Sequence, residues 1–196
     1  MEHYYSEQQS SPLKIRKIMQ RIKGVEFIFN TSSGVFSKNS VDTGTLILAE
    51  SMSMEKKSKV LDIGCGIGVL GICAARLFDA DVSMSDINKR CVMLARMNAK
   101  INDVKAEFFQ GSLYEPVKKY DFDVVLSNPP QNTGKKLCFE IIEGSRGYLK
   151  ENGTLQLVAR HNKGGKSLSE KMKEIFGNVK VIAKKAGYWV YVSVKE

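Results

Sequence analysis

From Lys57 to the end of the chain, short runs that favour strands alternate with stretches that favour helices. The expected strands are 59–63, 81–85, 106–109, 122–127, 154–160, 179–183 and 188–194, and the expected helices are 69–77, 88–99, 137–149 and 167–176. Strands separated by helices pair in parallel through right-handed crossovers, whereas the last two strands are close enough to pair as an antiparallel hairpin. The pattern predicts an open α/β fold, with a mostly parallel seven-stranded sheet, helices on both faces and a C-terminal antiparallel hairpin.

The residues before Lys57 do not follow this alternation. Four apolar residues have the spacing of one helix face and predict a helix over 11–23: Ile15, Ile18, Met19 and Ile22. A hairpin is expected over 25–37, because two apolar runs flank a turn-rich segment, and a short helix is expected to begin near Asp42.

The composition is that of one globular domain. With 196 residues, 43% of them hydrophobic, the chain 1–196 is expected to form a single domain in which an extension, 1–56, packs on a catalytic core, 57–196. No apolar run is long enough to span a membrane and no leader pattern opens the chain, so a cytoplasmic protein is expected, with no membrane partner. Four cysteines without a CxxC pair and two histidines do not make a plausible metal site, and no metal is expected.

The chain is basic. Thirty Lys and Arg against 21 Asp and Glu give a formal net charge of +9. A basic excess favours a polyanionic partner such as nucleic acid, although many basic proteins bind none. The cationic residues of 11–23 have no acid among them, which makes that segment a candidate phosphate contact as well as a candidate solvated face.

A glycine-rich turn follows the first core strand in the sequence VLDIGCGIG, which places Gly64, Gly66 and Gly68 between a strand and a helix. Glycines are needed where the chain turns sharply and its backbone approaches a ligand. The spacing also fits a dinucleotide fingerprint. However, the carboxylate of Asp62 would repel a pyrophosphate and suits a cofactor with a positive amino-acid head group, which favours S-adenosylmethionine over a nicotinamide dinucleotide. Asp86, at the end of the next strand, is placed to accept a ribose diol.

A third motif, SNPP, follows the strand 122–127 and should face the same crevice, because the carboxyl ends of parallel strands meet the ligand in such sheets. Asn128 offers a side-chain carbonyl, and Pro129 and Pro130 stiffen the backbone and leave carbonyl acceptors without competing N–H donors. Such a site accepts both hydrogens of an amino group. We therefore expect Asn128, Pro129 and Pro130 to be the catalytic residues.

In this order the three motifs resemble class I S-adenosylmethionine-dependent methyltransferases, which have a Rossmann-like fold. More narrowly, GVFSKNSVDTGTLIL followed by these motifs is similar to the methyltransferase small-domain family, which includes ribosomal RNA guanine-N2 methyltransferases and compact archaeal relatives. The resemblance implies cofactor contacts from the three motifs and from the segment before the core, at Asp62, Gly64, Cys65, Gly66, Asp86, Ile87, Gly111, Ser112, Asn128, Phe36 and Thr43.

Two positions depart from the family pattern. Ser112 stands where many members carry an acid that contacts adenine. Gln131 follows NPP where many amine methyltransferases have an aromatic residue that stacks on the target base. The second departure puts the identity of the target in doubt more than the chemistry.

The leading functional hypothesis is methyl transfer from S-adenosylmethionine to an exocyclic base amine in RNA, guanine N2 of ribosomal RNA, by a monomer or homodimer. Alternatives within the same chemistry are an adenine amine of DNA or RNA and the side-chain amide of a protein glutamine. From other classes come a nicotinamide-dependent oxidoreductase, disfavoured by Asp62, and a non-catalytic RNA-binding module, disfavoured by the intact motifs.

Overall fold

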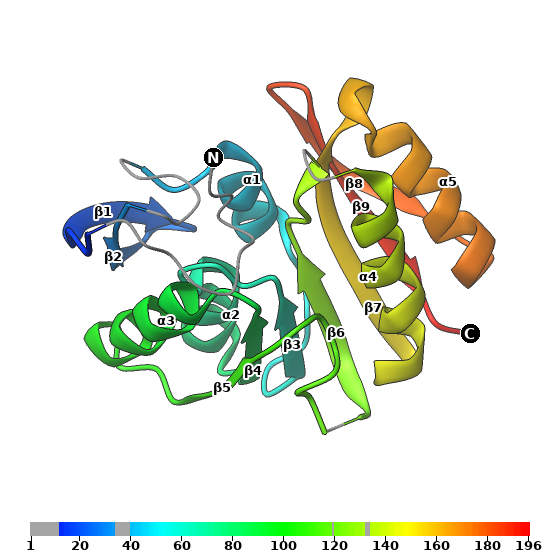
Figure 1. The fold of residues 1–196 in the computed structure, drawn as a ribbon. Coiled ribbons are helices and arrows are strands. Elements are labelled where there is room, and N and C mark those ends of the chain that lie inside the picture. The colour runs from blue at the N-terminus through cyan, green and yellow to red at the C-terminus, as the bar shows by residue number, and fades with distance from the viewer. Residues whose placement is uncertain (1–11, 34–39, 119, 132–133) are drawn as a thin grey trace.

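The computed structural model describes residues 12–33, 40–118, 120–131 and 134–196. Its main sheet has seven strands: β3 (Lys59–Ile63), β4 (Asp81–Asp86), β5 (Ala106–Gln110), β6 (Phe122–Ser127), β7 (Leu149–Arg160), β8 (Lys180–Lys185) and β9 (Tyr188–Val194). Their order is β5-β4-β3-β6-β7-β9-β8 (Figure 1). The pairs among β3 to β7 are parallel, and β9 runs antiparallel to both β7 and β8. This confirms the predicted sheet and its terminal hairpin.

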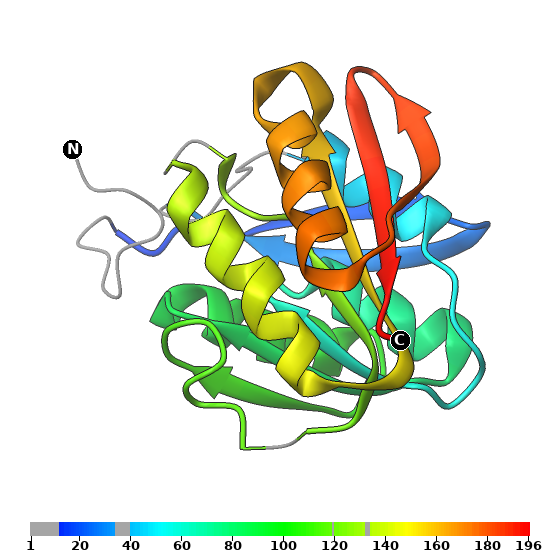
Figure 2. The same cartoon turned by 90° about the vertical axis from the view of Figure 1, so that its right-hand side faces the viewer.

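Five helices and a short 3-10 turn connect and cover the sheet: α1 (Thr43–Ser51), α2 (Val69–Phe78), α3 (Lys89–Ile101), α4 (Lys135–Tyr148), η2 (His161–Lys163) and α5 (Gly165–Phe176). Helices α1, α2 and α3 share one apolar cluster with one face of the sheet, and α4 and α5 share a second cluster with the opposite face (Figures 1 and 2). The predicted core helices are thereby confirmed, as is the helix after Asp42. In the described part of the chain no helix is long and apolar enough to cross a membrane.

The helix expected over 11–23 is wrong. Strand β1 (Arg16–Ile22) pairs antiparallel with β2 (Val25–Thr31) in a separate two-stranded sheet. The two residues that join them, Lys23 and Gly24, have φ of 46° and 80°, as two-residue hairpin turns require. The hairpin expected over 25–37 is also wrong, because the partner of β2 precedes it in the chain; residues 34–37 lie outside the described residues.

The sequence pattern at β1 fits either kind of element. The spacing of Ile15, Ile18 and Ile22 suits a helix, but Ile18, Gln20 and Ile22 also alternate as they would in a strand. Met19 separates the two possibilities, since a helical face would bury it and the structure leaves it 70% exposed. Pairing with β2, whose Phe27 and Phe29 are fully buried, decides in favour of the strand.

Helix α3 holds the other edge of β2 with two asparagines one turn apart. Asn98 accepts from the N–H of Asn30 (2.6 Å) and donates to its carbonyl (3.0 Å), and Asn102 does the same at Ile28 (3.1 and 2.7 Å). Asn98 also donates to the carbonyl of Ile67 in the glycine-rich turn (2.9 Å). The side-chain amides thus replace a neighbouring strand and fix the hairpin against α3 and the glycine-rich turn.

The mutation Asn98→Ala is expected to destabilise the fold by about 3 kcal/mol, because it leaves buried backbone groups at Asn30 and Ile67 without partners. Urea denaturation followed by circular dichroism measures this. The matched control is Lys100→Ala on the exposed side of the same helix, which should change the free energy of unfolding by less than about 0.5 kcal/mol. Equal stabilities of the two variants would contradict the assigned role of Asn98.

Candidate functional site

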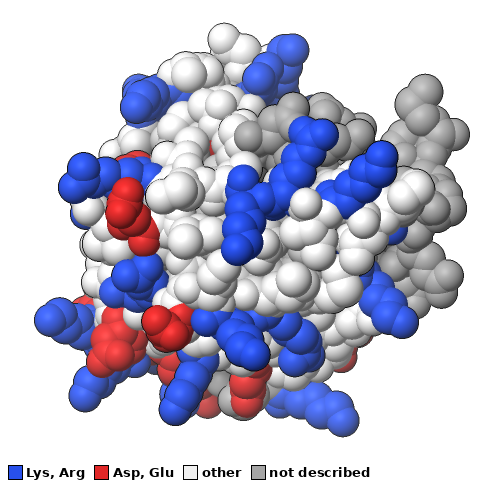
Figure 3. Space-filling model, turned by 90° about the vertical axis from the view of Figure 1, so that its left-hand side faces the viewer, with Lys and Arg blue, Asp and Glu red and all other residues white. Residues whose placement is uncertain are grey.

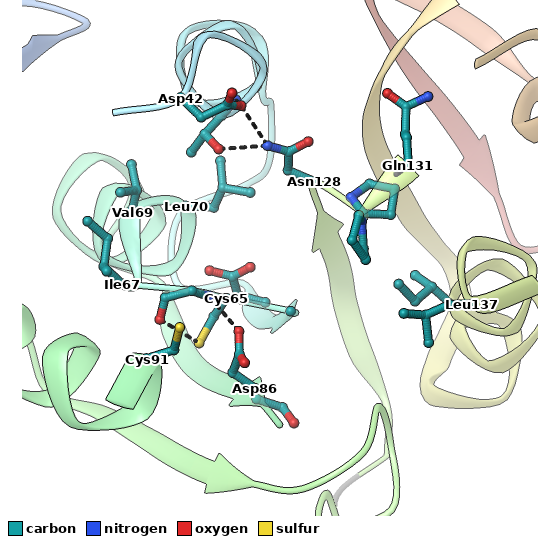
Figure 4. A pocket seen from close by; sticks show the side chains of 18 of the residues that line it. Asp42, Cys65, Ile67, Val69, Leu70, Asp86, Cys91, Asn128, Gln131 and Leu137 are labelled. Atoms are coloured by element: carbon teal, nitrogen blue, oxygen red, sulfur yellow. Dashed lines mark hydrogen bonds between the residues drawn. The ribbon is translucent and has the colours of Figure 1, made fainter. Parts of the chain in front are cut away.

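A cavity of about 540 Å³ lies at the carboxyl ends of β3, β4 and β6 (Figure 4). It is the place where parallel α/β sheets bind ligands. The cavity brings together the glycine-rich turn, the end of β4, the SNPP segment, the start of α1 and the face of α4. Its lining residues are Ser40, Val41, Asp42, Thr45, Asp62, Gly64, Cys65, Gly66, Ile67, Val69, Leu70, Ser85, Asp86, Ile87, Cys91, Ser112, Leu113, Asn128, Pro129, Pro130, Gln131, Leu137, Ile141, Arg160, Lys163 and Tyr188.

The glycine-rich turn presents bare backbone to this cavity. Gly64 and Gly66 have φ of 67° and 54°, a region that side chains disfavour. A Cβ added to either residue would have nothing within 4 Å, so the space in front of this backbone is open. The conformation and the open space together make a cradle for a ligand that contacts the main chain.

Asp62 lies beneath this turn at the end of β3 and is 1% exposed. One carboxylate oxygen, Oδ2, accepts from the N–H of Gly71 in α2 (2.9 Å), whereas Oδ1 has no hydrogen-bond partner among the described residues. Burial raises the pKa of Asp62 to about 7, against an ordinary value of 3.8. An unsatisfied buried carboxylate oxygen in a cavity wall is the feature expected of a site for a cationic group.

Asp86 closes β4 and ties the turn to the next loop. Its Oδ2 accepts from the N–H of Gly66 and its Oδ1 from the N–H of Asn88, both at 2.8 Å. Burial raises the pKa of this carboxyl, and the two backbone donors oppose the rise. Each oxygen retains a second lone pair, so the carboxylate can still accept from a ligand diol in the cavity.

Asn128 lies where β6 ends, on the opposite wall from the glycine turn. Its Nδ2 donates to Asp42 Oδ2 and to Thr45 Oγ1, both at 2.8 Å (Figure 4). Both hydrogens of the amide are therefore used, and the carbonyl oxygen Oδ1 points away from Asp42. Beside it, Pro129 and Pro130 have no N–H to donate, so Asn128 Oδ1 and the Pro129 carbonyl can accept from a ligand amine.

The side chain of Gln131 bonds the backbone at the end of β7. Its Oε1 accepts from the N–H of Arg160 (2.7 Å), and its Nε2 donates to the carbonyl of Lys163 (3.1 Å). These bonds join the SNPP segment to the end of β7, whose Arg160 lies over the ring of Tyr188, 5.0 Å from its centre. The side-chain amide of Gln131 is thus bonded to the backbone, and the cations Arg160 and Lys163 line the cavity beside it.

Most of the predicted site residues meet in this cavity. Ten of them line it, namely Asp62, Gly64, Cys65, Gly66, Asp86, Ile87, Ser112, Asn128, Pro129 and Pro130. Two do not: Thr43 is exposed at the start of α1, and Gly111 packs against Pro116. Phe36 lies outside the described residues.

Several lining residues were missed by the sequence reasoning. Three of them come from segments without a motif: Arg160, Lys163 and Tyr188. The sequence pattern at Leu137 and Ile141 indicates only the apolar face of a helix. Thr45 could have been found, because it lies three residues after the helix-capping Asp42, where its N–H donates to the capping carboxylate.

Residues 26–192 match the family model of the methyltransferase small domain. YbxB of Bacillus subtilis, described only as an uncharacterized protein, is 37% identical over 99% of this chain and 98% of its own length. Ribosomal RNA small subunit methyltransferase C of Hamiltonella defensa is 32% identical over 87% of this chain, and the Escherichia coli protein of that name is 31% identical over 84%. The chain spans about half the length of these two relatives, 51% and 48%.

A solved structure has the same fold. The T. thermophilus 16S rRNA N2 G1207 methyltransferase, in complex with AdoMet and guanosine, superposes with a TM-score of 0.83 at 24% sequence identity. The similarity covers 96% of this chain and 52% of that one. It extends over both the sheet and the hairpin side of the present structure.

Proposed function

This chain belongs to the methyltransferase small domain family, whose reaction is methyl transfer from S-adenosylmethionine, and we propose that its methyl acceptor is an exocyclic base amine in RNA, guanine N2 of ribosomal RNA. The observation that carries the proposal is the orientation of Asn128, whose amide hydrogens are both held by α1 while its oxygen is left for a ligand amine. The names of the rRNA methyltransferase relatives support RNA as the substrate.

The residues of the cavity fit the cofactor. S-adenosylmethionine, when bound, supplies an electrophilic methyl group on its sulfonium. The unpartnered Oδ1 of Asp62 suits its ammonium group, the open backbone at Gly64 and Gly66 suits its methionine portion, and Asp86 suits its ribose hydroxyls. We assign these residues, with Cys65, Ile87 and Ser112 of the same walls, to cofactor binding.

Asn128 and the Pro129 carbonyl would accept the two hydrogens of the target amine. An exocyclic base amine is a poor nucleophile because its lone pair is delocalised into the ring, and two acceptors favour the pyramidal form that attacks in line. These two acceptors would hold the amine while it takes the methyl group from the sulfonium, and the amine would then lose a proton to water. Acceptors aimed at the developing positive charge stabilise it during this step.

Tritiated methyl transfer to separated RNA, DNA and protein fractions, with nucleoside analysis of the labelled fraction, tests the proposal. Label recovered as N2-methylguanosine in RNA is the expected result. Label as N6-methyladenosine or on protein glutamine would keep the chemistry and overturn the acceptor. The nicotinamide-dependent alternative has no support in a chain of this family.

The RNA would also need a surface outside the cavity, and we assign it to the β1–β2 hairpin. The described stretch 12–33 carries five Lys and Arg and one acid, Glu26. Lys17 and Arg21 alternate with the exposed Met19 on the outer face of β1. In Figure 3 Lys and Arg are spread over this side of the molecule, and Asp and Glu lie mainly toward its left and lower left. A cationic ribbon with an exposed apolar side chain suits phosphates and an unstacked base.

Charge reversal at Lys14, Lys17 and Arg21 to Glu is expected to weaken RNA binding at least about tenfold and to flatten its salt dependence, since fewer counterions are then released. Fluorescence anisotropy over a salt series measures both quantities. The matched control reverses three exposed lysines far from the hairpin in sequence, Lys118, Lys136 and Lys173. If both triple variants lose the same affinity, the hairpin has no special role.

A further inference from the structure

The amide of Asn128 is held in one of two possible orientations by residues that precede it by more than eighty positions. Nδ2 donates to Asp42 Oδ2 and Thr45 Oγ1, both at 2.8 Å, across separations of 86 and 83 residues. Asp42 is the N-cap of α1 and Thr45 lies in its first turn, beside the cavity (Figure 4). The contact therefore connects the start of α1 to the proposed catalytic group.

Only one of these two partners can determine the orientation of the Asn128 amide. A side-chain amide that turns by 180° exchanges its NH₂ and its oxygen, and the second orientation would point NH₂ at the target amine. The hydroxyl of Thr45 either donates or accepts, so it tolerates both. An ionised carboxylate only accepts, so Asp42 requires the NH₂ of Asn128 to face it. The oxygen is then left for the ligand.

Asp42 is itself fixed. Its Oδ2 also accepts from the N–H of Thr45 at 3.0 Å as the N-cap of α1, so the helix holds the carboxylate in place. A hydrogen bond to a charged acceptor is shorter and stronger than a neutral one and polarises the amide. The negative charge on Asn128 Oδ1 increases as a result, which improves it as an acceptor for an amine that becomes cationic.

We propose that Asp42 is a positioning residue for methyl transfer, which orients and polarises the amide of Asn128 so that Oδ1 faces the methyl acceptor. The inference rests on the proposed role of Asn128 as the acceptor for the target amine. In this role Asp42 acts through Asn128. The residue that caps α1 would therefore also affect the rate of methyl transfer.

The test is Asp42→Ser. Serine is as good an N-cap, so α1 keeps its start, but its side chain is too short to reach Asn128. The kcat for methyl transfer to the labelled substrate is expected to fall about 10- to 100-fold, while the dissociation constant for S-adenosylmethionine changes less than about threefold. The matched control is Asp123→Ser at the opposite end of β6, where the carboxylate also accepts a backbone N–H, that of Lys59 (2.7 Å). It should leave both quantities unchanged.

An exchange of the two side chains distinguishes positioning from general damage. Asn128→Asp alone replaces the hydrogen bond to Asp42 with two carboxylates that repel each other. It should reduce kcat at least about 100-fold. The double variant Asp42→Asn with Asn128→Asp restores a donor and an acceptor, with a carboxylate oxygen facing the cavity. It should recover at least about tenfold in kcat over Asn128→Asp. A double variant no better than the single one contradicts the proposal.

A second measurement does not depend on the substrate. In NMR spectra the two Nδ2 protons of Asn128, assigned by their absence from Asn128→Ala, should exchange slowly with solvent in the native protein and at least about tenfold faster in Asp42→Ser. Unchanged exchange would refute the positioning role even if RNA is the acceptor. Faster exchange in a protein that labels no RNA would retain the positioning role and refute the RNA proposal.

Discussion

Asn128→Ala is expected to reduce methyl transfer about 100- to 1,000-fold, the largest effect of any single substitution on the rate. The substitution removes Oδ1, the one side-chain acceptor that the structure turns away from α1 and leaves for the target amine. The amine would then attack with one hydrogen unpaired and its developing charge poorly stabilised. Tritium incorporation from S-adenosylmethionine under single-turnover conditions measures the loss.

The cofactor should still bind to this variant. Asp62 and Asp86, on the other wall, keep their hydrogen bonds to Gly71 and Gly66, so the dissociation constant for S-adenosylmethionine should change less than about threefold. Gln110→Ala, which removes an exposed amide at the end of β5, is the matched control and should retain full activity. Full activity of Asn128→Ala would overturn the assignment of the acceptor.

Asp62→Asn is expected to have two opposite effects, on cofactor affinity and on stability. It removes the carboxylate assigned to the ammonium group, and affinity for S-adenosylmethionine should fall at least about 100-fold because a buried charge loses its partner. Isothermal titration calorimetry measures this loss. Asp123→Asn, a carboxylate substitution at a partly exposed site near the amino end of β6, should bind the cofactor normally.

Stability without cofactor should change in the other direction. The folded-state pKa of Asp62 is raised to about 7 from 3.8, so between these pH values the folded chain holds a proton that the unfolded chain has lost. The folded state is therefore penalised as pH rises through this window, and the penalty is complete above pH 7. Asp62→Asn, which cannot ionise, should be more stable than the native protein at pH 8, by about 4 kcal/mol, and close to it near pH 4.

Cofactor affinity should follow the same titration with the opposite sign. Ionised Asp62 attracts the ammonium group, so native affinity should rise as pH increases through about 7, and this pH dependence should be absent in Asp62→Asn. Thermal unfolding with and without S-adenosylmethionine from pH 5 to 9 measures both effects at once. A native protein whose affinity is constant across this range would contradict the assignment of Asp62.

Elements with strong local patterns could be predicted from the sequence, and so could the motifs placed on them. The strand at 59–63, the glycine turn after it and the SNPP segment after β6 all appear where their patterns indicate. The parallel arrangement then brings Asp62, Asp86 and Asn128 to one edge of the sheet, because the carboxyl ends of parallel strands coincide there. The central wall of the cavity was therefore predictable.

The N-terminal segment was not predictable, because its pattern fits two periods. Ile15, Ile18, Met19 and Ile22 have helical spacing, and the same stretch alternates well enough for a strand. Whether the segment forms a helix or a strand depends on its pairing with β2. Asn98 and Asn102 in turn bond the other edge of β2, across separations of 68 and 74 residues. Local spacing contains no information about such partners.

By itself, the sequence determined the fold class and the motifs of the proposed cofactor and acceptor sites, since each depends on residues close together in the chain. Only the tertiary structure decided which atom of Asn128 faces the cavity and which cations surround the entrance. The sequence does not show which way the amide of Asn128 is turned. Its orientation depends on the carboxylate of Asp42, 86 residues earlier, which accepts from Nδ2. Arg160, Lys163 and Tyr188 likewise reach the site only because β7 ends beside β6 and the antiparallel β9 begins beside the end of β7.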